Sequence, residues 1–182
     1  LPAQAPELLI RLLCAWACFH CASMWMNADL DQDESEVIFG HPAPIPGSVR
    51  HFSFSASILG IAVCGSISWV LMGIGICTAV LGWMYSSKSI CWKSHPVAGP
   101  LVNGVGYGVL SPLAGWWIVD VPMTARTVMT GAVLVMGVMG TYFCLQGYQY
   151  EVDKKRGYRT FVAVYGSSAV LRFGRVCFAG VV

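Results

Sequence analysis

Five acidic residues lie within eight positions, directly after the apolar run 12–28. They are Asp29, Asp31, Asp33, Glu34 and Glu36, in a chain with only nine Asp and Glu. If the helix of the apolar run continues, Asn27 and Asp31 lie one turn apart on one face. Grouped oxygen ligands suit Mg²⁺, which keeps several waters and bridges to phosphate oxygens. The alternative is a solvated acidic loop, which most charge runs are.

A second polar stretch follows a later apolar run. Gln146, Gln149 and Asp153 are spaced three and four residues apart and share one helical face. Four cations follow, namely Lys154, Lys155, Arg156 and Arg159. A carboxylate beside such cations suits a metal–diphosphate pair, because Lys and Arg take the phosphate oxygens that the metal leaves. The alternative is a positively charged anchor at the end of a membrane helix.

The composition indicates the environment in which these residues act. The chain has 182 residues, of which 56% are hydrophobic and 11% charged, against about 25% charged in soluble domains. This composition predicts an all-α, multi-pass membrane protein. A net charge of +2 is too small to indicate a nucleic acid partner. The eight cysteines lie mostly in apolar runs without paired spacing, as free thiols do.

The apolar runs predict six spans, since a membrane helix needs about 20 apolar residues. We place them at 8–26, 52–66, 68–86, 101–119, 127–146 and from 160 onward. Gly65 and Ser66 are the expected turn between the second and third spans. The segment from Asp120 to Thr124 separates the fourth span from the fifth, and Arg172 and Arg175 interrupt the sixth span.

The polar loops are expected on one side of the membrane. Loops 27–51, 86–99 and 147–159 are separated by two spans each, so they face the same side. They carry seven of the eleven basic residues. The positive-inside rule therefore predicts that these loops are cytoplasmic.

Two segments resemble the signatures of a known family. The residues from Asn27 through Asp31 to Glu36, followed by 41–47 (HPAPIPG), resemble the first signature of the UbiA superfamily of intramembrane prenyltransferases. The stretch 151–160 (EVDKKRGYRT) is similar to the second. Tyr85 with Lys88, and Asn103 with Tyr107, resemble motifs between them. The second motif is closest to fungal members, which include UbiA-type terpene cyclases.

The resemblance implies a fold and a reaction. It implies a single UbiA-like transmembrane domain over 1–182, holding the second to seventh helices of the family fold, so we expect a truncated chain. It further implies Mg²⁺-dependent transfer of a prenyl group from an isoprenoid diphosphate to an acceptor, in terpenoid or meroterpenoid biosynthesis. By analogy, the expected location is an endomembrane.

The resemblance also implies roles for particular residues. The expected catalytic residues are Asp31, Asp153 and Lys88. One Mg²⁺ would be held by Asn27, Asp31 and Glu36, and a second by Asp153 with Gln149. The expected substrate-binding residues are Asn27, Lys154, Arg159, Asn103 and Tyr107. The aromatic side chains that could stabilise an allylic carbocation are Trp25, Tyr107, Trp116, Trp117, Tyr142 and Phe143, although Trp and Tyr near span ends are usually interfacial.

The chain departs from the family pattern at four positions. Ser35 stands where the third ligand of the first motif is expected, and Ala43 stands where an Arg is expected. Gln146 and Gln149 replace two Asp of the second motif, and a Gln carbonyl ligates a hard cation without contributing charge. These departures leave open a non-catalytic or degenerate paralogue. A UbiA-type terpene cyclase also stays open, because it differs from a transferase in cavity shape and in whether an acceptor is present.

Overall fold

The computed structural model describes residues 4–31 and 44–181, which contain helices and no strand. The chain divides into two compact units. The N-terminal unit is Pro6–Ile90, and the C-terminal unit is Cys91–Val182 with the first residues of the chain. The prediction of a single domain concerns the assembly of these units and stays a prediction.

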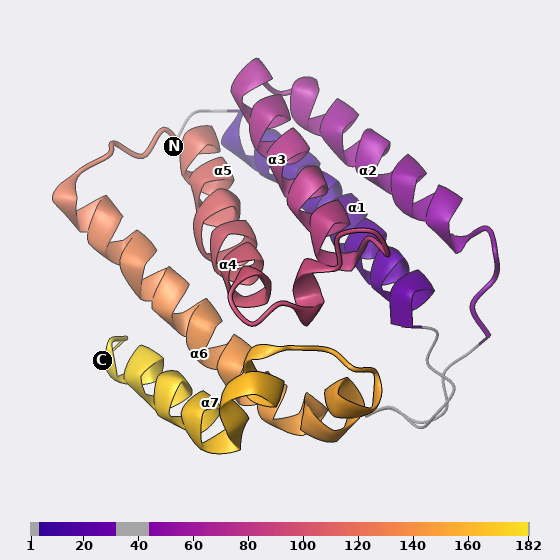
Figure 1. The fold of residues 1–182 in the computed structure, drawn as a ribbon. Helices are drawn as coiled ribbons and strands as arrows, with labels where there is room; N and C mark the ends of the chain where they lie inside the picture. Colours follow the sequence, from indigo (N-terminus) through magenta and orange to yellow (C-terminus); the bar gives the residue numbers. More distant parts are fainter. Residues whose placement is uncertain (1–3, 32–43, 182) are drawn as a thin grey trace. The chain divides into compact units, whose positions relative to one another are not determined.

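The N-terminal unit consists of three helices (Figure 1). They are α1 (Ala5–Asp31), α2 (Val49–Gly65) and α3 (Trp69–Ser86). Ser66 to Ser68 form the turn between α2 and α3, where the Ser68 hydroxyl accepts a hydrogen bond from the Leu71 N–H at 3.1 Å. The predicted turn is confirmed at Ser66, while Gly65 is the last residue of α2.

The ring of Phe19 lies among the three helices of this unit. Phe19 of α1 is buried against Gly60 of α2 and Gly75 of α3. A Cβ at these two glycines would lie 2.8 Å and 3.0 Å from the ring. The absence of both side chains therefore lets the helices approach closely, as small residues do in membrane proteins.

The C-terminal unit begins with a short 3₁₀ helix, η1 (Trp92–Ser94). It is followed by one helical segment that has α4 (Ala98–Val105), a π-helical turn η2 (Gly106–Leu110) and α5 (Ser111–Ile118). The predicted break follows, with Asp120 at a φ of 53°. Thr124 then caps α6 (Ala125–Lys155), because its hydroxyl accepts a hydrogen bond from the Thr127 N–H at 3.2 Å.

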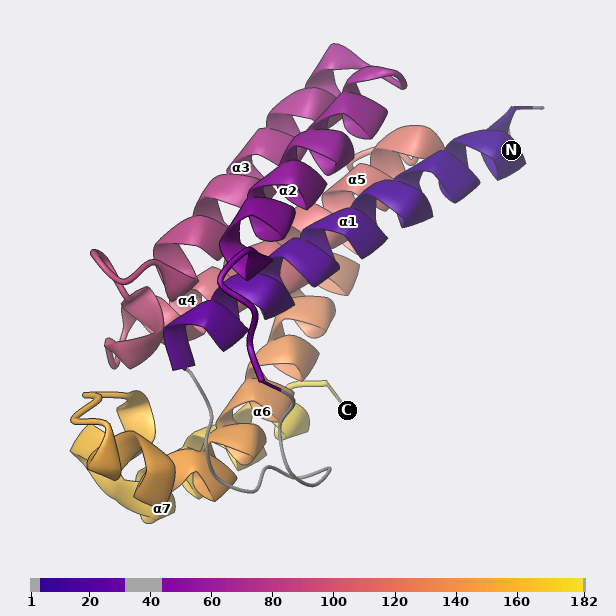
Figure 2. The same ribbon diagram turned by 90° about the vertical axis from the view of Figure 1, so that its right-hand side faces the viewer.

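The core of this unit lies between α6 and α7 (Phe161–Ala179), which run side by side in both ribbon views (Figures 1 and 2). The buried apolar side chains are Phe143 from α6 with Val162, Val170 and Cys177 from α7. Gly166 bends α7 with a φ of 79°, a conformation that glycine adopts without strain. Arg172 and Arg175 lie on exposed positions of α7, which continues past both.

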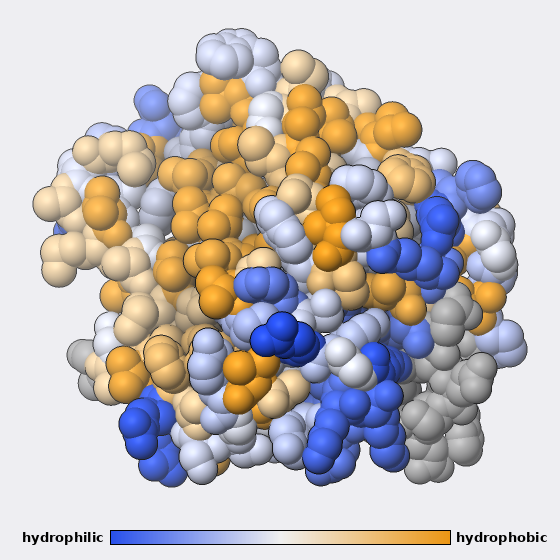
Figure 3. Space-filling model, viewed as in Figure 1, coloured by the Kyte–Doolittle hydropathy of each residue, from blue (hydrophilic) through white to orange (hydrophobic). Residues whose placement is uncertain are grey.

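The surfaces of the helices fit a membrane. Within the described residues, α1, α3, α6 and α7 are long and apolar enough to cross a bilayer, and α2 is a shorter apolar helix. At most 22% of the apolar stretch of each of these four helices is buried, so most of its residues are at least partly exposed. Hydrophobic surface covers much of the face in Figure 3. The prediction of an all-α, multi-pass membrane protein is confirmed.

Candidate functional site

The polar end of the N-terminal unit joins three helix termini. The last turn of α1 carries Asn27 and Asp31, and both are half-buried. The Ser86 hydroxyl, at the end of α3, donates a hydrogen bond of 3.4 Å to Asn27 Oδ1. The predicted helical spacing of Asn27 and Asp31 is present, because α1 continues to Asp31.

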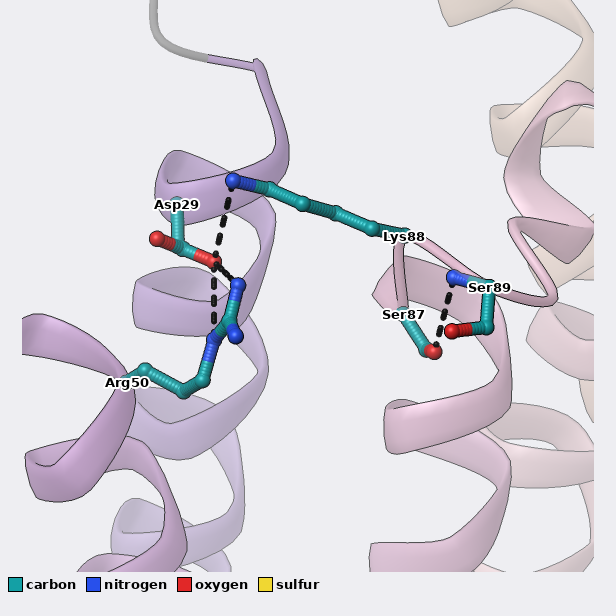
Figure 4. A network of polar contacts seen from close by, with 5 residues as sticks. All are labelled: Asp29, Arg50, Ser87, Lys88 and Ser89. Carbon is teal, nitrogen blue, oxygen red and sulfur yellow. Dashed lines mark hydrogen bonds and ion pairs between the residues drawn. The ribbon is translucent and has the colours of Figure 1, made fainter.

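Asp29 forms the centre of an ion-pair cluster at this end (Figure 4). Its Oδ2 accepts hydrogen bonds from Nε and Nη2 of Arg50, at 3.1 Å and 2.6 Å. Lys88 Nζ lies 3.7 Å from the same oxygen. Lys88, a predicted catalytic residue, is thus brought beside the α1 terminus that carries Asn27 and Asp31.

The rest of the first motif lies outside the described residues. This applies to Asp33, Glu34, Ser35, Glu36, His41 and Ala43. The role of Glu36 as a third metal ligand therefore stays a prediction. The described part of the motif supplies one amide and one carboxylate, Asn27 and Asp31.

The polar end of the C-terminal unit contains Asp153, near the end of α6. Its side chain is buried, with 5% exposed, and its Oδ2 accepts a hydrogen bond of 2.8 Å from the Thr160 hydroxyl. Thr160 is the N-cap residue of α7. Asp153 therefore fixes the start of α7 from the end of α6.

Gln146, seven residues before Asp153 on α6, also connects α6 to α7. It is 3% exposed, and its Nε2 donates to the Tyr142 hydroxyl at 2.7 Å. Its Oε1 accepts a hydrogen bond of 3.2 Å from the Val162 N–H, in the first turn of α7. The amide carbonyl of Gln146 thus accepts a hydrogen bond from a backbone N–H at the N-terminus of α7.

The other predicted residues of this end are more exposed. Gln149 is exposed on α6, while Asp153 is buried, so the structure does not bring these two predicted ligands to one buried position. Lys154 Nζ lies 5.8 Å from the ring centroid of Tyr150, and Arg159 is exposed. Lys93 Nζ lies 5.6 Å from the centroid of the Tyr158 ring, so η1 and the loop after α6 share one end of the unit.

Asn103 and Tyr107 lie on the segment from α4 to η2. The Asn103 Nδ2 donates to the Gly99 carbonyl at 3.0 Å, within its own helix. Tyr107 is half-exposed in the π-helical turn. Such turns occur frequently at functional sites.

The predicted aromatic residues differ in exposure. Trp25 and Trp117 are exposed, Phe143 is buried, and Trp116 and Tyr142 are intermediate. Phe143 contacts Tyr142 and Phe161 with ring centroids 5.7 Å and 4.9 Å apart, so it belongs to the core between α6 and α7.

Comparison with known proteins decides the family. The model of the UbiA prenyltransferase family matches residues 2–182. The chain belongs to the UbiA prenyltransferase family. None of the curated proteins matches the sequence.

Two solved structures share the UbiA fold with this chain. A UbiA homolog from Archaeoglobus fulgidus bound to Cd²⁺ superposes with a TM-score of 0.77 at 17% identity, over 96% of this chain and 63% of that chain. A second structure of a UbiA homolog from Archaeoglobus fulgidus gives 0.78 at 17% identity, over 96% and 62%. This UbiA-family chain therefore spans less than two thirds of the length of either structure.

The donor set at the α1 terminus fits a hard divalent cation. Within the described residues there is no group of three His, Cys, Asp and Glu that could hold a metal. Mg²⁺ does not need such a group, because it is commonly bound through one or two carboxylates plus waters and substrate phosphates. Asn27 and Asp31 supply oxygen ligands of this kind.

Two features of this UbiA-family chain were not predicted. Arg50 was counted only among the basic residues of loop 27–51, although a cation three residues after the motif stretch 41–47 is the signal that could have identified its contact with Asp29. The use of Gln146 by Tyr142 and Val162 was also missed, because a hydrogen bond across sixteen residues leaves no local pattern.

Proposed function

We propose that this chain is the membrane-embedded part of a prenyltransferase that moves a prenyl group from an isoprenoid diphosphate to an acceptor, with Mg²⁺. The observation that carries this proposal is the family match over residues 2–182, joined to a cluster of oxygen ligands and cations at the α1 terminus. The prenyltransferases of this family generally use a divalent metal, and the Archaeoglobus fulgidus homolog was solved with Cd²⁺.

The charges of the site define its chemistry. Asn27, Asp31 and Glu36 would hold one Mg²⁺, and Asp153 with Gln149 a second. The metal ions would neutralise the diphosphate as it leaves. Lys88, Lys154 and Arg159 would take the remaining phosphate oxygens through charge-assisted hydrogen bonds. Asn103 and Tyr107 would line the path of the substrate.

The reaction then proceeds away from the charged loops. The allylic C–O bond breaks, and its electron pair leaves with the diphosphate. The prenyl cation must be kept from water and can be stabilised by aromatic faces. The π electrons of the acceptor form the new C–C bond, and the acceptor loses a proton. We further propose that the motif loops face the cytoplasm, at an endomembrane.

The test uses the protein in lipid nanodiscs with geranyl, farnesyl or geranylgeranyl diphosphate. We expect release of diphosphate that requires Mg²⁺ and is abolished in the double variant Asp31→Ala, Asp153→Ala. Unchanged release in the folded double variant would contradict the assignment. Hydrocarbon products formed from the donor alone would identify a terpene cyclase of the same family.

A non-catalytic membrane paralogue is the second candidate. Gln146 favours it, since its amide is bonded to Tyr142 and to the start of α7, where the family motif has an Asp. If the chain shows no binding of Mg²⁺ with diphosphate, this candidate replaces the first.

A further inference from the structure

We infer that Thr160 is the positioning residue of Asp153, and that its hydroxyl orients the carboxylate that would hold the second Mg²⁺. This inference rests on the proposed function, in which Asp153 is a metal ligand, and it adds a residue that has no role there. The Thr160 hydroxyl donates a hydrogen bond of 2.8 Å to Asp153 Oδ2. Both residues are buried, with 3% of Thr160 and 5% of Asp153 exposed.

Thr160 does not use its hydroxyl in the way expected of its position. It is the N-cap residue of α7, where the side-chain oxygen of a Thr ordinarily accepts a hydrogen bond from a backbone N–H of the first turn. Thr124, the N-cap residue of α6, accepts such a bond from the Thr127 N–H at 3.2 Å. In the described part of α7, no backbone N–H donates to the Thr160 hydroxyl. The hydroxyl is instead used for the bond to Asp153.

Gln146 replaces Thr160 as the cap of α7. The Gln146 Oε1 accepts a hydrogen bond of 3.2 Å from the N–H of Val162, the second residue of α7. A capping Thr160 would accept from this N–H or from the next one. The start of α7 is thus satisfied by an acceptor from α6. The helix terminus therefore does not require the Thr160 hydroxyl, which remains available to Asp153.

The backbone between the two residues forms a closed turn. The Tyr158 N–H donates to the Asp153 carbonyl at 2.9 Å, and Gly157 turns the chain with a φ of 70°, which glycine adopts without strain. Asp153 therefore holds the segment that carries Thr160 with its backbone as well as with its side chain. Because the turn fixes the place of Thr160, the bond to Oδ2 restrains the rotation of the carboxylate.

A restrained carboxylate fits the role of a metal ligand. In metal sites the ligating carboxylates are themselves hydrogen-bonded, and a change in such a partner typically costs about 10–100-fold in metal affinity. The alternative is that Thr160 only connects α6 to α7, as Gln146 does. The two roles differ in whether the effect of Thr160 on metal affinity depends on Asp153.

The experiment measures Mg²⁺ affinity with inorganic diphosphate by calorimetry in nanodiscs, together with thermal unfolding of the metal-free protein. Thr160→Val removes the hydroxyl and keeps the shape, and we expect it to weaken Mg²⁺ affinity by about 10–100-fold. Thr160→Ser keeps a hydroxyl and should restore most of the affinity. Thr124→Val is the matched control, because it removes the N-cap hydroxyl of α6 at the other end of that helix. It should lower the unfolding temperature and leave Mg²⁺ affinity unchanged.

A double-mutant cycle with Asp153→Ala separates positioning from a structural role. If Thr160 acts through Asp153, Thr160→Val should change Mg²⁺ affinity by less than about twofold in the Asp153→Ala background, because interacting residues are not additive. The double variant removes donor and acceptor together, so neither is left without the other. Comparison of Asp153→Ala with the double variant also decides the question if Thr160→Val alone does not fold.

Three results overturn the inference while Mg²⁺–diphosphate binding, and with it the proposed function, stands. They are unchanged Mg²⁺ affinity in folded Thr160→Val, a loss of equal size in both backgrounds, and unchanged affinity in Asp153→Ala. If the unmodified protein neither binds Mg²⁺ with diphosphate nor releases diphosphate from farnesyl diphosphate, the proposed function fails and this inference with it.

Discussion

At the scale of single residues, the two motifs use their side chains differently. Asn27 and Asp31 end α1, beside the cations of the N-terminal unit. Asp153 and Gln146 are both bonded to the start of α7. The second motif therefore ties α6 to α7, whereas we propose that the first carries most of the metal chemistry.

Asp31→Asn tests the first motif. The amide keeps the shape of the side chain but removes the charge that Mg²⁺ requires. Changes in groups that only support metal ligands cost about 10–100-fold, so we expect diphosphate release to fall by at least about 100-fold. Glu7→Gln, the same chemical change at the other end of α1, should retain full activity. An active Asp31→Asn would remove Asp31 from the site.

Gln146→Met tests the connection between α6 and α7. The apolar side chain leaves the buried Val162 N–H without its acceptor, which costs about 1–3 kcal/mol. We therefore expect a lower free energy of unfolding, measured by thermal unfolding in detergent. Gln149→Met, at an exposed position three residues on, should change it by less than about 0.5 kcal/mol. Equal stability of the two variants would contradict the role given to Gln146.

At the scale of elements, hydropathy predicted the apolar helical segments but not their ends, and four of the described helices are long and apolar enough to span a membrane. α1 continues to Asp31, and α6 to Lys155, beyond the predicted ends at 26 and 146. Hydropathy detects only the part of a helix that lies in lipid, and a polar helical turn outside it leaves no apolar signal. The π-helical turn was missed for a related reason, because one extra residue in a helix scarcely alters the apolar pattern.

The candidate site was predictable only in part. The helical spacing of Asn27 with Asp31, and of Gln149 with Asp153, is visible in the sequence, because helical periodicity is local. The pairing of Asp29 with Arg50 was not, since these residues are 21 positions apart. Tertiary packing sets such contacts.

Gly60→Ala tests the packing of the N-terminal unit. The added Cβ would lie 2.8 Å from the Phe19 ring, so the ring or the helix must shift. Overpacking of this kind typically costs about 1–3 kcal/mol. Gly73→Ala on α3 is the control, because no atom lies within 4 Å of its added Cβ. Thermal unfolding should show a loss for Gly60→Ala and none for Gly73→Ala, and the reverse order would refute this packing.

At the scale of the whole molecule, the proposed function requires both motifs on one side of the membrane. Reporter cysteines at Ser89 and Gly157, in a background without native cysteines, should react with an impermeant reagent added from the cytoplasmic side. A reporter at Thr124, before α6, should react from the opposite side. Labelling of Ser89 and Gly157 from different sides would contradict the topology.

The proposed Mg²⁺–diphosphate site is tested most directly by an experimental structure with Mg²⁺ and a non-hydrolysable isoprenoid thiodiphosphate. We expect oxygens of Asn27 and Asp31 about 2.0–2.1 Å from one Mg²⁺, with Asp153 facing the same diphosphate and Lys88 on its outer oxygens. A structure in which the diphosphate contacts neither Asp31 nor Asp153, or in which these carboxylates lie on opposite membrane faces, would contradict it.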